Sequence, residues 1–126
     1  MSDKDFITKY LKDFSSLILP SEEITEKIIE IKKILLNVKI NDSKVMIFGN
    51  GGSAAIASHV SVDLTKNAGI RSVNYNEADL ITCFSNDFGY SRWIEKAIEF
   101  YGKSSDILVL ISSSGRSQNM INACNA

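Results

Sequence analysis

The sequence predicts an α/β protein in which helices cover both faces of a parallel sheet. Two short apolar runs, residues 45–48 (VMIF) and 107–111 (ILVLI), have the length and composition of buried strands. A turn rich in glycine or serine follows each run, and a helical pattern follows each turn. Strands that alternate with helices in this way are typical of a parallel sheet, because each helix returns the chain to the end where the next strand begins.

Two amphipathic helices are expected before the first strand. Aromatic side chains recur at helical spacing at Phe6, Tyr10 and Phe14. Pro20 ends this helix and Ser21 caps a second one. The second helix has an apolar stripe that should face inward, formed by Ile24, Ile28, Ile31 and Leu35. We therefore expect a helical arm at 1–40 and a domain at 41–126, with an aromatic face that suits either a partner subunit or its own domain.

The helix after the first strand should span residues 53–66. It turns Ala57, Val60 and Leu64 toward the sheet, and Gly69 ends it. The last helix begins near Gln118. Between them we expect a short strand at 71–75, a helical stretch at 80–84, a loop at 85–90 and a helix at 91–101. Three strands make a thin sheet with an uncovered edge, so the domain is expected to be truncated at its C-terminus.

The composition excludes several classes of partner. The 126 residues carry a net charge of −1, which favours neither nucleic acid nor an anionic membrane. No apolar run approaches the length of a bilayer span, and the charged N-terminus lacks a signal-peptide pattern. Cys83 and Cys124 have no metal-ligand spacing and suggest reduced thiols in a cytoplasmic protein.

The two turns after the apolar strands have the composition of phosphate sites. Asn50, Gly51, Gly52 and Ser53 lie between the first strand and its helix, where unpaired backbone N–H groups and a partial positive charge attract an anion. A second turn supplies hydroxyl donors from Ser112, Ser113, Ser114 and Ser117. Either turn alone could serve only to connect a strand to a helix, but two together favour phosphate binding.

His59 and Asp63 form a candidate catalytic or metal-binding pair. His59 is the only histidine, and Asp63 follows it by one helical turn on the helix that opens at the first turn. A lone histidine is more often structural than functional, so both interpretations stay open.

Residues 49–54 also fit the dinucleotide pattern G-x-G-x-x-A, and Glu77 follows the second strand. A single match of this kind is weak, and the serine-rich second turn is not expected in such a protein, so no nucleotide cofactor is predicted.

These motifs, in this order and with these gaps, resemble the sugar isomerase (SIS) domain family, and more narrowly its phosphoheptose isomerase branch. The residues that carry the resemblance are FGNGGSAA at 48–55, His59, SNDFG at 85–89 and ISSSGRS at 111–117. The resemblance covers about the first two thirds of the family's domain. It implies a flavodoxin-like three-layer α/β/α sheet of five parallel strands, and a homo-oligomer, dimer or tetramer, with active sites between subunits.

The resemblance also implies roles for individual residues. The substrate phosphate is held by the serines of both turns. Asn50 matches the asparagine before the family's double glycine, and Asn86 and Asp87 match an Asn-Asp pair that lines the sugar site. His59 matches a histidine that binds zinc in some members. Asp63 stands where the isomerases have a glutamate that acts as base and can bind zinc, and Arg116 replaces an asparagine of the second turn.

Two functions follow from this resemblance. The first is an aldose–ketose isomerase that converts sedoheptulose 7-phosphate to a heptose 7-phosphate through an enediol, with Asp63 as base and His59 as proton donor or zinc ligand. The second is a non-catalytic protein of the same fold that binds a sugar phosphate and acts through protein partners. The shorter Asp63 and the family's missing C-terminal acid–base residues favour the second, while the serine turn fits both.

Overall fold

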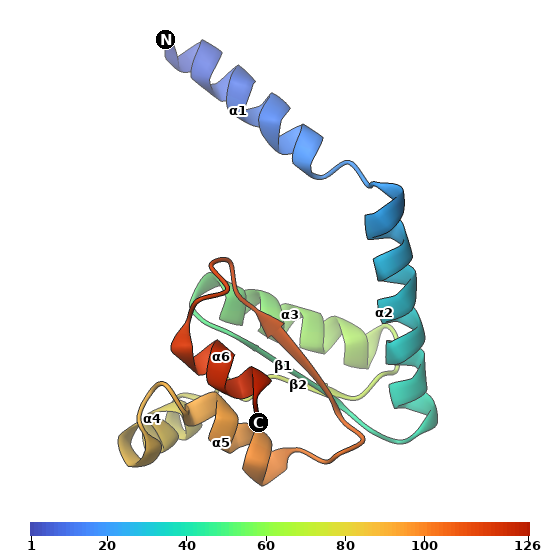
Figure 1. Ribbon diagram of the computed structural model, residues 1–126, viewed down its shortest axis with the longest axis vertical. Helices are drawn as coiled ribbons and strands as arrows, with labels where there is room; N and C mark the ends of the chain where they lie inside the picture. Colours follow the sequence, from blue (N-terminus) through green and yellow to red (C-terminus); the bar gives the residue numbers. More distant parts are fainter. The chain divides into compact units, whose positions relative to one another are not determined.

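The computed structural model describes all residues from Met1 to Ala126 (Figure 1). The chain divides into two compact units, Met1–Lys33 and Ile34–Ala126. The first unit holds α1 (Asp3–Leu17) and the start of α2 (Glu22–Ile40), and the second holds every strand. No helix is both long enough and apolar enough to cross a membrane.

Local capping fixes where the first two helices begin. The Ser2 hydroxyl accepts a hydrogen bond from the Asp5 amide at 3.2 Å, and the Ser21 hydroxyl accepts one from the Ile24 amide at 3.2 Å. The predicted break at Pro20 and cap at Ser21 are therefore confirmed. No residue of α1 is buried. Three members of the stripe expected to face inward on α2 are exposed: Ile24, Ile28 and Ile31.

The three strands form one parallel sheet in the order β2-β1-β3. β1 (Val45–Gly49) is central and pairs with β3 (Ile107–Ile111) along its whole length. β2 (Ser72–Val73) is shorter than the strand expected at 71–75. The difference arises at Tyr75, whose φ of +52° takes the backbone out of the extended region.

The core lies on both faces of β1, because successive side chains of a strand point to opposite sides. Met46 and Phe48 pack on one face against Trp93 and Ile94 of α5 (Trp93–Tyr101). Val45 and Ile47 pack on the other face in a cluster with Val38, Ala57 and Ile70. Figure 1 shows α3 (Gly52–Lys66) on one side of the sheet and α5 and α6 (Gln118–Cys124) on the other. The predicted α/β fold with a parallel sheet between helical layers is therefore confirmed.

Two local expectations were wrong. α4 spans Ala78–Phe88, so most of the loop expected at 85–90 is helix. The rings of Phe84 and Phe88, one helical turn apart, pack with their centroids 5.8 Å from each other. This contact stabilises the helix through Ser85, Asn86 and Asp87, although such residues often form turns. On α3, Ser61 is buried and Val60 is exposed, since the helix is rotated from the expected orientation.

Candidate functional site

Both predicted phosphate turns leave the same edge of the sheet. Gly49 pairs in register with Ile111, so the first turn (residues 50–53) and the second turn (residues 112–117) begin side by side at the carboxyl ends of adjacent strands. Figure 1 shows the connections from β1 to α3 and from β3 to α6 at this common edge. The topology therefore brings the Gly-rich and Ser-rich turns together, as a shared anion site requires.

The first turn leads into α3 with part of its backbone already bonded, because the Ser53 and Ala54 amides donate to the carbonyls of Asn50 and Gly51 at 3.0 Å. Gly51 has a φ of +54°, which non-glycine residues rarely adopt, and it begins α3 without a side-chain cap. The Gly52 amide makes no such bond and is left for water or a ligand at the start of the helix. Gly52 and Ser53 follow directly, with Gly52 exposed and Ser53 half-buried.

The second turn is held in shape by its own serines. The Ser112 hydroxyl accepts a hydrogen bond from the Gly115 amide at 3.1 Å, and the Ser114 hydroxyl accepts one from the Arg116 amide at 3.2 Å. Each hydroxyl oxygen is thereby fixed while its hydrogen stays free to donate. Ser113, like Ser114 and Arg116, is exposed, whereas Ser117 is half-buried immediately before α6.

Asn50 joins the first turn to the helix that follows the second. Its amide group donates to Asn119 Oδ1 at 3.0 Å and accepts from Asn119 Nδ2 at 2.9 Å. The Tyr90 hydroxyl donates to Asn50 Oδ1 at 3.0 Å. Asn119, only 3% exposed, was missed by the sequence analysis. The only feature of the sequence that could have pointed to Asn119 is its place on the same face of α6 as the apolar Met120 and Ala123.

We expect Asn119→Asp to lower the free energy of unfolding by about 1–3 kcal/mol. Aspartate keeps the shape of asparagine, but its carboxylate cannot donate to Asn50 Oδ1, so two oxygens would face each other in a buried position. Urea unfolding measures the change. Asn41→Asp is the control, because Asn41 is exposed and its side chain makes no hydrogen bond. Equal stability of the two variants would show that the reciprocal amide pair contributes nothing.

Asn86 and Asp87 lie in the last turn of α4 and are exposed. Asn86 Nδ2 donates to Asp87 Oδ1 at 2.9 Å, and neither side chain makes a hydrogen bond to the phosphate turns. The chain returns to the first turn just beyond them, through the contact of Tyr90 with Asn50. α4 therefore ends beside the candidate site without closing it.

The structure does not bring His59 and Asp63 to the turns of the same chain. His59 Nε2 lies 3.4 Å from Asp63 Oδ2, and the two side chains are 80% and 50% exposed on the outer face of α3. Asp63 lies near the end of α3 and Ser53 at its start, about 15 Å apart along an axis that rises ~1.5 Å per residue. Asn67 Nδ2 also donates to Asp63 Oδ1 at 3.0 Å. This pair faces away from the body of its own chain.

The residues present do not form a complete metal site. No three side chains of histidine, cysteine, aspartate or glutamate lie together as metal ligands. His59 and Asp63 supply two ligands, whereas a zinc site in a protein uses at least three.

Comparison with known proteins extends the motif resemblance to the whole chain. The chain is 31% identical to the phosphoheptose isomerase of Sulfurimonas denitrificans over 95% of its own length, and 36% identical to that of Buchnera aphidicola over 97%. It spans 66% and 63% of those two relatives, respectively. The solved phosphoheptose isomerase of Neisseria gonorrhoeae superposes with a TM-score of 0.82 at 27% identity, covering 98% of this chain and 68% of that one.

The family model for the SIS domain matches residues 9–126, which include both phosphate turns and the His59–Asp63 pair. This match shows that the chain belongs to the SIS domain family.

Proposed function

We propose that this chain is part of an aldose–ketose isomerase that interconverts sedoheptulose 7-phosphate and a heptose 7-phosphate. The observation that carries the proposal is the convergence of the two turns at one sheet edge, tied together by Asn50 and Asn119. The relatives named phosphoheptose isomerase support the choice of substrate. The ligand phosphate would accept hydrogen bonds from the serine hydroxyls and from the amides at the start of α3.

The reaction needs a base beside the carbon that loses its proton. In the ketose, a carboxylate takes the proton from C1 to give an enediol, the O1 proton moves to O2, and C2 then receives a proton to give the aldose. We assign the base to Asp63 and proton donation to His59. His59 lies about 9 Å and Asp63 about 15 Å along α3 from Ser53, at a rise of ~1.5 Å per residue. Because both side chains are also exposed, we propose that they serve the turns of a second copy of the chain.

Zinc could bind here only if further ligands completed the site. His59 and Asp63 would contribute two ligands, and the others would have to come from outside these residues. No step of the proposed reaction depends on the metal. A cytoplasmic location is likewise part of the proposal.

The test of the proposal is proton exchange in deuterated water. The full-length gene product should replace the C1 or C2 proton of sedoheptulose 7-phosphate with deuterium, which NMR detects without assuming a product. Binding of the sugar phosphate without exchange would instead support the second candidate, a non-catalytic binding protein. The exposure of Asp63 and its distance from Ser53 are the observations that favour this alternative.

Ser114→Ala should weaken the binding of sedoheptulose 7-phosphate about tenfold or more, because one charge-assisted hydrogen bond is lost. Isothermal titration calorimetry measures the dissociation constant. Ser105→Ala is the matched control, since Ser105 is an exposed loop serine that precedes β3 at the opposite edge of the sheet. Equal affinity of the unmodified chain and Ser114→Ala would remove the second turn from the phosphate site.

We expect the chain to self-associate through its exposed apolar helical faces. Phe6, Tyr10 and Phe14 of α1 are each more than half exposed, and a monomer would leave this surface in water. Sedimentation at micromolar concentration should show a dimer or tetramer, and the double variant Phe6→Ser/Phe14→Ser should shift the distribution toward monomer. The variant Lys12→Ser, on the same helix, is the control. A monomer before any substitution would contradict both the assembly and a site shared between copies.

A further inference from the structure

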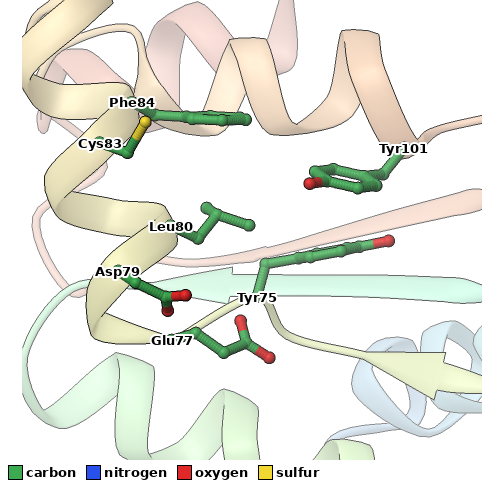
Figure 2. A pocket seen from close by; sticks show the side chains of 7 residues that line it. All are labelled: Tyr75, Glu77, Asp79, Leu80, Cys83, Phe84 and Tyr101. Atoms are coloured by element: carbon green, nitrogen blue, oxygen red, sulfur yellow. The ribbon is translucent and has the colours of Figure 1, made fainter.

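One cavity of the chain lies away from the phosphate turns. It has a volume of about 490 Å³, whereas the cavity beside the second turn has about 230 Å³. The larger cavity lies between the end of β2, the first half of α4 and the end of α5, and it is lined by Tyr75, Glu77, Asp79, Leu80, Cys83, Phe84 and Tyr101 (Figure 2). The candidate sugar residues occupy the opposite end of α4. Its volume falls in the range of small-ligand sites, about 300–1,000 Å³.

Three aromatic rings line this cavity in nearly parallel planes. The Tyr75 and Tyr101 centroids are 4.9 Å apart with 26° between the planes, and those of Phe84 and Tyr101 are 6.4 Å apart with 15°. Figure 2 shows the rings in offset layers, with Leu80 beside them. Parallel rings of this kind accept a flat group that can stack against a ring face.

The charge at the cavity is negative and unpaired. Figure 2 shows the carboxylates of Glu77 and Asp79 on the same side of the rings. Neither carboxylate takes part in a hydrogen bond or an ion pair, and no lysine, arginine or histidine lines the cavity. Lys44 donates to the Tyr101 carbonyl at 2.7 Å, but its charge is paired with Asp106.

The Tyr75 phenol is held neutral and in place. Burial raises its pKa above the ordinary value, followed by the nearby Asp106 and Tyr101 and, least, by Glu77. Its neighbours fix the strained backbone at φ +52°, because Asn74 Oδ1 accepts from the Asn76 amide and Asn76 Nδ2 donates to Ala54 and Ser58. A bulky residue is rarely kept in this conformation. The ring therefore lines the cavity before any ligand arrives.

We propose that this cavity binds a small planar organic cation of the guanidinium class. A guanidinium group is flat, stacks on aromatic faces and pairs with carboxylates through its fixed fork of N–H donors. The stacked rings supply the face and the two free carboxylates supply the charge. An anionic sugar phosphate has the wrong charge for this cavity, so the proposal does not depend on the proposed isomerase activity.

The experiment is an NMR titration of the ¹⁵N-labelled full chain with propylguanidinium, and with propylurea as its neutral isostere. Propylguanidinium should shift the amides of residues 75–84 and of Tyr101 saturably in the millimolar range, and propylurea should not. The double variant Glu77→Gln/Asp79→Asn should weaken binding about fivefold. Both residues are exposed, so the variant should fold, and its spectrum verifies this directly.

Glu26→Gln is the matched control, because Glu26 is also exposed and has no ion-pair partner. It should leave the affinity for propylguanidinium unchanged. The proposal is wrong if propylurea produces the same shifts, if the double variant binds as well as the unmodified chain, or if no amide of the cavity moves. Tighter binding by arginine in a blocked Gly-Arg-Gly peptide would identify a protein side chain as the occupant and overturn the small-ligand assignment.

Discussion

Gly49→Ala is expected to lower the free energy of unfolding by about 3 kcal/mol. A Cβ at Gly49 would lie 2.3 Å from the Ser53 carbonyl carbon, 2.4 Å from its oxygen and 2.7 Å from the Ala54 nitrogen. These are backbone atoms, so no rotamer change can relieve the contact. β1 and α3 would have to separate at the start of the phosphate site, and the melting temperature should fall by roughly 10 °C or more.

Gly52→Ala is the control for this experiment. A Cβ at Gly52 meets nothing within 4 Å, and the residue is the first of α3, where alanine fits the helical backbone without strain. Its stability should equal or slightly exceed that of the unmodified chain. If Gly49→Ala and Gly52→Ala have the same free energy of unfolding in urea and the same melting temperature, the close approach of α3 to β1 does not constrain the fold.

Asp63→Asn is expected to lower the rate of proton exchange at C1 or C2 of sedoheptulose 7-phosphate by at least about 10²-fold, because the amide cannot accept the proton. The affinity for the sugar phosphate should stay nearly unchanged, since in this proposal the phosphate is held by the serine turns and not by Asp63. Asp63→Glu should retain exchange, because it presents the same carboxylate one methylene further out. NMR of the full-length gene product in deuterated water measures all three rates.

Glu99→Gln removes another exposed carboxylate and should not alter the exchange rate. Exchange that persists in Asp63→Asn would place the base elsewhere. A gene product that binds sedoheptulose 7-phosphate but shows no exchange, with or without added zinc, would favour the non-catalytic function. The affinity measurement separates these outcomes, because it reports on the turns alone.

Short-range chemistry made much of this fold predictable. The Ser21 cap depends on a residue three positions away, and the end of α3 depends on Gly69, whose φ of +64° allows the Ile70 amide to bond the Leu64 carbonyl. The strands were equally clear, because β1 is buried along its whole length and its side chains are apolar on both faces.

Features that depend on distant contacts were not predictable in the same way. α4 continues through Asn86 and Asp87 because aromatic packing outweighs their turn preference. The rotation of α3 that buries Ser61 instead of Val60 is set by the sheet beneath it. In the sequence, Asn119 looks like an ordinary polar residue of a helix, because its partner Asn50 is distant in the chain and is brought to it only by the fold.

The Asn50–Asn119 pair also links binding to the order of folding. Its two members are 69 positions apart in the chain, and between them lie α3, β2, α4, α5 and β3. A chain in which β3 has not yet docked on β1 has the first turn in place but not the second. It therefore has only half of the anion site, and only the completely folded chain binds the ligand tightly. A phosphate ligand at a hundred times its dissociation constant would stabilise the finished state by about 2.7 kcal/mol. It should therefore slow proteolysis of the segment between β1 and α6, far beyond the residues that it touches.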